Sequence, residues 1–484
     1  MKENKDFLGT EPVGKLLRSL ALPTVAAQLI NMLYNIVDRI YIGHIPGDGP
    51  MALTGVGVCM PIIMIVSAFA ALVSTGGAPR ASISMGRGDQ KSAENILGNC
   101  FCLQLLVSAV LTAVLLIWNR DFLMAFGASE NTISYAVSYM NIYAVGTIFV
   151  QLTLGMNAFI TAQGFAKIGM LSVLIGAVLN IVLDPIFIFG LGMGVRGAAA
   201  ATVLSQAVSC IWVLSFLMGK KTFLRIRAKY MRLNPKVFLP CIALGLATFI
   251  MQSSESVISV CFNSSLLNYG GDIAVGAMTI LTSVMQFAML PLQGLGQGAQ
   301  PIISYNYGAG NKSRVKKAYF LLLKSSLFYS CLLWGGIMLF PTGFASIFTS
   351  DPQLVEFSAM ALRIYMAVMF TSDPALIDFT KHALRIYMAC MFLFGIQMAC
   401  QMTFTSLGNA KASIAVAVVR KFVLLLPLIY LLPRILPMDQ TKAVYLSEPI
   451  ADTLAVTFTV ILFTFQFRKA LRALDQKAEA SGDR

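Results

Sequence analysis

Three acidic residues lie deep inside apolar runs, where a carboxyl group is costly: Asp38, Asp184 and Glu255. On insertion scales, an Asp at the centre of a membrane helix costs about 2.5–3.5 kcal/mol. A carboxyl group in a medium of low dielectric constant therefore pairs with a cation, or binds a proton or a hard cation such as Na⁺. The sequence predicts an exchangeable proton or Na⁺ site at Asp38, Asn180 and Asp184.

Polar side chains accompany Asp38 and Asp184 at helical spacing. Asn31, Tyr34 and Asn35 lie on the helical face of Asp38, and Asn180 precedes Asp184 by about one turn. These side chains supply donors and oxygen ligands but no fixed positive charge, and we expect the first three to take part in substrate or proton binding. The alternative is a structural ion pair between Asp38 and Arg39, whose long side chain can reach the end of the span.

Glu255 belongs to a short polar stretch, Gln252 to Ser256, inside an otherwise apolar run. Met289 and other methionines lie in this run and the next, and methionine-rich surfaces adapt to ligands of varied shape. We expect Glu255, Gln252 and Met289 to bind a substrate cation or a proton. The alternatives are a hydrogen-bonded structural carboxyl for Glu255 and ordinary packing for most methionines.

The composition defines the elements that must position these acids. Of the 484 residues, 57% are apolar and only 12% are charged, whereas soluble proteins carry about 25% charged residues. The mean hydropathy of +0.75 agrees. These values exclude a soluble enzyme, a disordered chain, a nucleic-acid-binding module and a disulfide scaffold, and leave a polytopic membrane protein. The nine cysteines form no CxxC pair and are interpreted as small buried apolar residues.

Apolar runs of helical length recur along the whole chain and predict an all-α membrane protein with twelve transmembrane helices. Runs this long exclude the strands of a membrane barrel. The predicted spans are Leu16–Ile42, Ala52–Ala78, Ile96–Trp118, Ile133–Asn157, Gly169–Gly190, Gly197–Met218, Val237–Phe262, Ile273–Gln300, Ala318–Phe340, Ala383–Ser406, Ala412–Leu432 and Ile450–Phe467.

The distribution of positive charge orients these spans. Most of the 36 Lys and Arg residues fall in segments that lie on one side when the spans alternate from an inside N-terminus. The loops on the other side hold only Arg120, Arg196, Arg434 and Lys442. Because basic residues concentrate in cytoplasmic loops, we expect both termini to be cytoplasmic, in segments 1–15 and 468–484.

The two halves of the chain are related by an internal repeat. The series Gly76, Pro79, Ser82, Gly86 and Gly88 recurs with the same spacing as Gly298, Pro301, Ser304, Gly308 and Gly310. Six spans per repeat give both halves the same orientation, and parallel repeats of this kind are a transporter architecture. We predict an N-terminal lobe at 16–218, a basic cytoplasmic linker at 219–236 and a C-terminal lobe at 237–467.

A tandem duplication interrupts the second repeat. Residues 348–369 and 370–391 share the pattern FTSDP followed by ALRIYMA. The repeat spacing predicts that the second copy continues into the tenth span and that the first copy lies as an extra piece on the outer face. The alternative is an error in sequence assembly.

Sequence patterns of the common enzyme classes are absent. The chain has no P-loop, no GxSxG and no HExxH. We therefore expect no enzyme activity and no cofactor apart from a coupling H⁺ or Na⁺. The expected partners are the lipid bilayer and small organic cations, with no nucleic acid, and we expect a monomer.

At this point the sequence resembles the MATE (multidrug and toxic compound extrusion) transporters, close to their MepA-like bacterial drug exporters. The matching stretches are Val37 to Gly43, Gly86-Arg87-Gly88-Asp89 with its echo Gly308-Ala309-Gly310-Asn311, Thr161 to Gly164, Asn180 to Pro185, and Gln300-Pro301. The resemblance implies a V-shaped pair of six-helix lobes in a bacterial plasma membrane. It also implies export of cationic or amphipathic drugs coupled to H⁺ or Na⁺ influx.

The resemblance also implies particular site residues. Its DinF-like branch places a cation site at Asp38, Asn180 and Asp184, with Tyr139, Asn157 and Thr202 as further candidates, and its NorM-like branch has an acid at the position of Glu255. The alternative is a lipid-linked oligosaccharide or polysaccharide flippase of the same superfamily, which needs several cations facing its cavity. Against it, the basic residues within spans, Lys324, Arg420 and Lys421, are few, and we place them near span ends.

Overall fold

The structure is a computed structural model of the chain and describes residues 6–47, 49–339 and 383–480. All regular elements in this part of the chain are helices. Twelve of them are long and apolar enough to cross a membrane. The prediction of an all-α protein with twelve transmembrane helices is therefore confirmed.

The N-terminal lobe consists of six long helices, α2 to α7, of which α6 ends in a short π-helical segment, η1. A short helix, α1, precedes them. Their bounds are α1 (Phe7–Thr10), α2 (Val13–Gly43), α3 (Gly49–Gly86), α4 (Gln90–Ala125), α5 (Ile133–Ala162), α6 (Ala166–Pro185), η1 (Ile186–Gly190) and α7 (Val195–Met218).

The C-terminal lobe repeats this plan with more interruptions. Helix α8 holds two spans, which meet at a non-helical residue, Gly271, and a π-helical segment, η4, breaks the eleventh span. The bounds are α8 (Pro235–Gly308), α9 (Lys312–Leu339), η3 (Met391–Leu393), α13 (Phe394–Ser406), α14 (Ala410–Val418), η4 (Val419–Leu425), α15 (Leu426–Ile435) and α16 (Gln440–Ala480).

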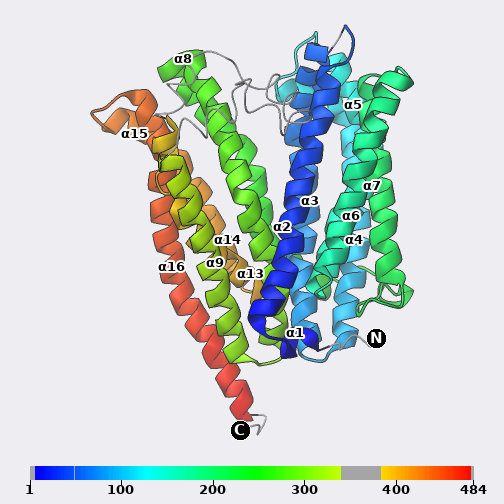
Figure 1. Ribbon diagram of the computed structural model, residues 1–484, viewed down its shortest axis with the longest axis vertical. Helices are drawn as coiled ribbons and strands as arrows, with labels where there is room; N and C mark the ends of the chain where they lie inside the picture. The colour runs from blue at the N-terminus through cyan, green and yellow to red at the C-terminus, as the bar shows by residue number, and fades with distance from the viewer. Residues whose placement is uncertain (1–5, 48, 340–382, 481–484) are drawn as a thin grey trace.

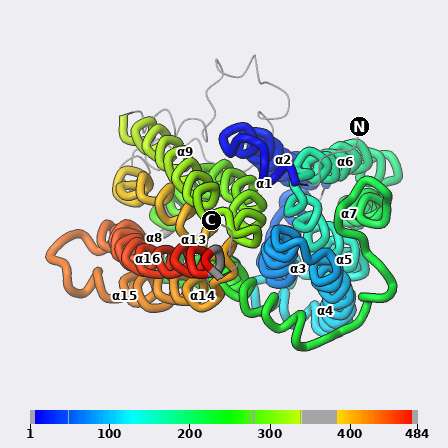
Figure 2. The backbone as a smooth tube through the Cα atoms, turned by 90° about the horizontal axis from the view of Figure 1, so that it is seen from below, coloured from blue at the N-terminus to red at the C-terminus, as the bar shows by residue number. Residues whose placement is uncertain are grey.

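The two lobes meet at the end that carries both termini and separate toward the opposite end (Figure 1). Seen from the terminal end, they form two groups of helices side by side (Figure 2). Glycines make this contact close: a Cβ on Gly76 of α3 would lie 1.8 Å from the carbonyl oxygen of Cys241 on α8. A Cβ on Gly245 would lie 1.8 Å from the carbonyl oxygen of Leu72. The backbones of α3 and α8 therefore touch directly.

The internal repeat is visible in the backbone. Gly88 ends the turn after α3 with φ +76°, and Gly310 ends the equivalent turn after α8 with φ +80°. This left-handed conformation favours glycine because a side chain is strained there. The next residue in the first lobe, Asp89, caps α4 by accepting a hydrogen bond from Ser92 N at 2.9 Å. The repeated glycines thus mark equivalent turns of two parallel lobes.

The basic linker between the lobes is anchored at its start. The Gln163 side-chain oxygen, at the end of α5, accepts hydrogen bonds at 2.8 Å from Thr222 Oγ1, Phe223 N and Leu224 N. Further on, Arg227 pairs with Glu94 of α4 at 2.8 Å. The linker therefore packs against the N-terminal lobe, in addition to supplying positive charge.

Predicted and observed spans agree in number and order but differ at their ends. The first span runs from Val13 to Gly43, and the eighth extends to Gly308, both beyond the predicted ends. The tenth span begins by Ala383, within the second duplicated copy. The first copy, 348–369, lies outside the described residues.

Candidate functional site

Two buried carboxyl groups face each other in the N-terminal lobe. Asp38 lies on α2, and Asp184 lies at the end of α6. Their side chains lie within interaction distance of each other, and Asp184 is completely buried. The ion pairs of the described residues all involve other acids, so neither group has a basic partner within 4.0 Å. Arg39, the partner that the sequence left open, acts on Asp38 electrostatically but does not form an ion pair with it within 4.0 Å.

Only some of the oxygens at these carboxyl groups receive a hydrogen bond. Asn180 Nδ2 donates to Asp184 Oδ1 at 3.2 Å and lies 3.4 Å from Thr202 Oγ1. Asp38 Oδ1, Asp184 Oδ2 and Asn180 Oδ1 are buried acceptors with no hydrogen-bond partner in the described part of the chain. Two adjacent carboxylates in a low dielectric repel each other unless a proton or cation lies between them. The arrangement is thus suited to hold one proton or one Na⁺.

Helix α6 ends in a way that fixes Asp184. The next residue, Pro185, has no N–H group, so it leaves one helical hydrogen bond unmade. The chain continues as the π-helical segment η1 instead of a regular helix. Such π-helical turns are frequent at functional sites. The break places Asp184 beside α2 and α7.

Two tyrosines complete the surroundings of the acid pair. Tyr34 interacts with Asp38, Asp184 and Asn35. Tyr139 interacts with Asp38 and Thr202 and stacks on Tyr143, with ring centroids 6.3 Å apart. The structure therefore gathers Tyr34, Tyr139 and Thr202 around the carboxyl groups.

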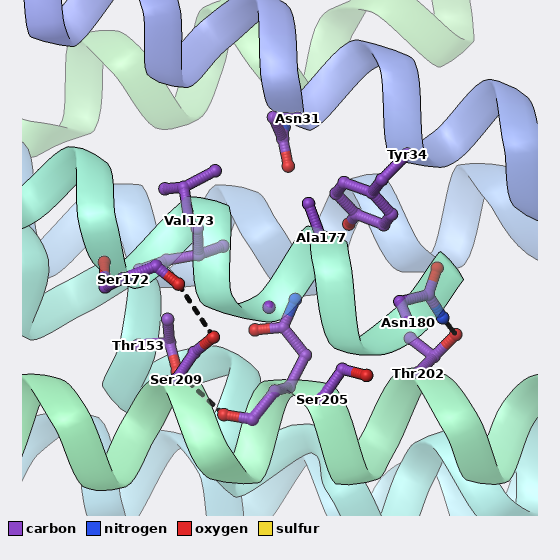
Figure 3. Close-up of a pocket in the computed structure, with 13 residues that line it drawn as sticks. Asn31, Tyr34, Thr153, Ser172, Val173, Ala177, Asn180, Thr202, Ser205 and Ser209 are labelled. Carbon is purple, nitrogen blue, oxygen red and sulfur yellow. Dashed lines mark hydrogen bonds between the residues drawn. The ribbon is translucent and has the colours of Figure 1, made fainter. Parts of the chain in front are cut away.

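A small cavity with several polar side chains in its wall lies beside Asn180, the partner of Asp184 (Figure 3). It has a volume of about 40 Å³, and a single water needs about 10–15 Å³, so it has room for a few water molecules. Asn31 and Tyr34 approach it from α2, Asn180 from α6 and Thr202 from α7 (Figure 3). Ser205 Oγ is a further buried atom without a partner here.

One of the candidates, Asn157, lies away from the acid pair, while Asn35 interacts with Tyr34 beside it. Asn157 donates to Gly169 O at 3.3 Å, four turns of α6 below Asp184 and about 22 Å along the helix at 1.5 Å per residue. Asn35 is part of α2 but donates back to Asn31 O at 2.6 Å. The sequence alone did not show how far Asn157 lies from Asp184 across the membrane, because the helix that Asn157 contacts was unknown.

A second charged cluster lies in the C-terminal lobe. Lys421 Nζ is 2.6 Å from Glu255 Oε1, and the Lys421 side chain is 3% exposed while that of Glu255 is 57% exposed. Arg420 is buried beside Asp452 at 2.8 Å and Glu448 at 3.7 Å. The placement of Arg420 and Lys421 near span ends was wrong, because η4 lies in the middle of the eleventh span.

Glu448 and Asp452 were missed by sequence reasoning. The twelfth span was predicted to begin at Ile450, whereas α16 begins at Gln440 and continues through Pro449. Two acids four residues apart, opposite an Arg-Lys pair in the preceding apolar run, were the available signal. Of the other candidates, Gln252 is exposed near Glu255, and Met289 packs against the core of this lobe.

The described residues contain no cluster of three or more His, Cys, Asp or Glu side chains suited to a metal ion. Instead, each lobe holds charged groups inside its spans, and the lobes are parallel repeats. This combination defines a membrane transporter built of two six-helix lobes.

The chain belongs to the MatE family, whose model matches residues 23–186, 246–368 and 359–431. The last two segments overlap within the duplicated region. The multidrug export protein MepA of Staphylococcus haemolyticus is 25% identical over 367 residues, covering 76% of this chain and 80% of that protein. MepA of Staphylococcus aureus strain N315 is 25% identical over 365 residues, covering 75% and 79%.

Solved structures share the fold. A crystal structure of MATE in the bent conformation matches with a TM-score of 0.85 and 23% identity, covering 99% of this chain and 100% of that one. The outward-facing structure of a multidrug resistance MATE family transporter of the MOP superfamily matches with a TM-score of 0.84 and 22% identity, covering 98% and 100%.

Proposed function

We propose that the protein is a cation-coupled antiporter that exports cationic or amphipathic drugs across a bacterial plasma membrane. The observation that carries this proposal is the buried Asp38–Asp184 pair, which takes part in no ion pair within 4.0 Å among the described residues. Such a pair gains or loses one positive charge, as H⁺ or Na⁺, at each change of conformation. No enzyme activity is proposed.

The coupling cycle follows from electrostatics. In the conformation seen here, the lobes separate at the end opposite the termini, which is the outside if both termini are cytoplasmic. A proton or Na⁺ entering from that side neutralises the repulsion between Asp38 and Asp184. The neutral pair allows α2 to pack differently against α6, which changes access between the two sides of the membrane.

The substrate class rests on two supports. The similar MepA proteins are named as multidrug exporters, and Glu255 offers an exposed carboxylate in the second lobe. A carboxylate on an apolar wall attracts organic cations without selecting one compound. We expect the protein to work as a monomer.

The coupling ion is decided by one transport experiment. The purified protein in vesicles should move ethidium when a pH gradient or a Na⁺ gradient is imposed separately. We expect movement with one of the two gradients and none without a gradient. No dye movement with either gradient, at normal orientation and protein content, would contradict the proposal.

The flippase alternative is less consistent with the second lobe. A lipid-linked oligosaccharide carries phosphates, which require uncompensated cations in the cavity. Arg420 and Lys421 are both paired with carboxylates, so the cluster carries no net positive charge.

The duplicated segment gives a separate prediction. Deleting residues 348–369 restores the repeat spacing, so the variant should insert normally and export dye at the wild-type rate. Insertion is measured as the amount of protein in the membrane, and export is measured as dye efflux. An inserted variant without efflux would show that the first copy is functional.

A further inference from the structure

The charged cluster of the C-terminal lobe has one more acid than base. Its members come from three elements: Glu255 on α8, Arg420 and Lys421 on η4, and Glu448 and Asp452 on α16. Arg420 is held by Asp452 and Glu448 and stacks over the Phe394 ring at 5.0 Å. With all groups ionised, the cluster therefore has a deficit of one positive charge, which a single monovalent cation can fill.

Glu255 faces the space between the lobes. It follows Cys241 by fourteen residues, which is nearly four complete turns at 3.6 residues per turn, so both lie on one face of α8. At Cys241 this face touches the backbone of α3 in the other lobe. Nearer the open end the same face is exposed and polar, with Gln252 and Ser259 beside Glu255. The exposed residues Val257 and Val260 point to a different, apolar side.

Lys421 contacts one acid of the cluster and acts electrostatically on another. Its side chain is almost completely buried, and its Nζ contacts Glu255 Oε1 at 2.6 Å. Lys421 also interacts electrostatically with Glu448, whose carboxylate is only loosely held by Arg420 at 3.7 Å. Glu448 on α16 is therefore a second acid that attracts the ammonium group.

We propose that Lys421 is a tethered cation that occupies Glu255 in the empty transporter, and that an organic monocation displaces it toward Glu448. This inference rests on the proposed function and adds a residue that sets substrate specificity. A cationic ligand must outcompete an ammonium group already in contact with the carboxylate. Lys421 thus weakens the binding of organic cations, so that only those with a high intrinsic affinity bind, and it does not change the binding of neutral ligands.

Displacement also connects the cleft to α16. When Lys421 leaves Glu255 for Glu448, it compensates that acid and lets Arg420 pair more fully with Asp452. The charge of the bound ligand is thereby transmitted from the exposed surface of α8 to a buried part of α16. The π-helical segment η4, which carries both bases, supplies the irregular backbone that such a movement needs.

The test measures binding of tetraphenylphosphonium to the purified protein in lipid nanodiscs, without an ion gradient. Lys421→Met should bind about tenfold more tightly than the wild type, because the internal competitor is gone. Glu255→Gln should bind about tenfold more weakly, and adding it to Lys421→Met should remove the gain. Affinity for a neutral amphipathic ligand should stay the same in all variants.

The matched control is Lys324→Met, which removes an exposed span lysine on α9 and should leave affinity unchanged. If folded Lys421→Met, at the wild-type melting temperature, binds the cation no more tightly than the wild type, Lys421 is only a structural partner and the proposal is overturned. If Lys421→Met does not fold, Glu448→Gln decides: weaker binding supports the displacement, and unchanged affinity overturns it.

The binding result is separable from the transport result. If the protein binds tetraphenylphosphonium as described but moves no dye in either gradient, the proposed role of Lys421 stands and the proposed antiport is contradicted. If the protein exports dye with a gradient while no variant binds tetraphenylphosphonium, the proposed antiport stands and the proposed role of Lys421 is overturned.

Discussion

Asp184→Asn should reduce the rate of ion-coupled dye efflux by about a hundredfold or more, because the charge of this group drives the proposed cycle. The substitution replaces the carboxyl by an amide of nearly equal volume, and a membrane interior tolerates the amide better than the acid. The hydrogen bond from Asn180 to the remaining oxygen can be kept. The variant should therefore fold and insert while losing the group that is filled and emptied on each cycle.

The measurement is dye efflux from vesicles with matched amounts of inserted protein. Asp38→Asn is the parallel case and should have the same effect, because the two carboxyl groups share one proton or cation. Asp121→Asn, at an exposed position near the end of α4, is the control and should transport normally. Wild-type efflux by Asp184→Asn at normal membrane levels would show that Asp184 is not the coupling group.

The fold was largely predictable because a bilayer allows few solutions. Long apolar runs leave only transmembrane helices, and the distribution of Lys and Arg restricts their number to an even one. The repeated Gly76 and Gly298 series gave the parallel lobes without any knowledge of contacts. The sequence analysis assigned Asp38 and Asp184 to one predicted cation site, and the structure brings the two acids together.

The second charged cluster was not predictable in the same way. Arg420 and Lys421 are stable at mid-membrane only because three acids from two other elements meet them. The sequence shows no such pairing between distant helices, and the twelfth span was predicted to begin at Ile450, directly after Pro449, where the structure has a continuous helix. A proline within a span is accommodated when neighbouring helices satisfy the freed backbone group. Because the start of the twelfth span was predicted too late, Glu448 was not recognised as lying inside a span.

The depth of Asn157 shows a related limit. A resemblance assigns a residue to a site by its position in a pattern, but the site depends on which helices are neighbours. Here Asn157 bonds to the start of α6, whereas Asp184 lies at its end. Helix packing, and not the pattern, decides which polar residues can share one ion.

Gly76→Ala prevents close contact of the lobes at the terminal end and should reduce dye efflux about tenfold or more, because overpacking of a tight contact costs about 1–3 kcal/mol. The new Cβ would lie 1.8 Å from Cys241 O and 2.8 Å from Gly245 N, both backbone atoms that cannot rotate away. The lobes must then separate there, which destabilises the conformation described above. Gly57→Ala on the same helix is the control, since nothing lies within 4 Å of its Cβ.

Cys241 reports the separation directly because its side chain is buried at this contact. In Gly76→Ala, a membrane-impermeant maleimide added from the cytoplasmic side should label Cys241, and Cys241→Ser should remove the added signal. The melting temperature should fall in Gly76→Ala and hold or rise in Gly57→Ala, since alanine is favoured over glycine within a helix by about 0.5–1 kcal/mol. Equal labelling, stability and efflux in the two variants would mean that the backbone contact between α3 and α8 does not hold the terminal end closed.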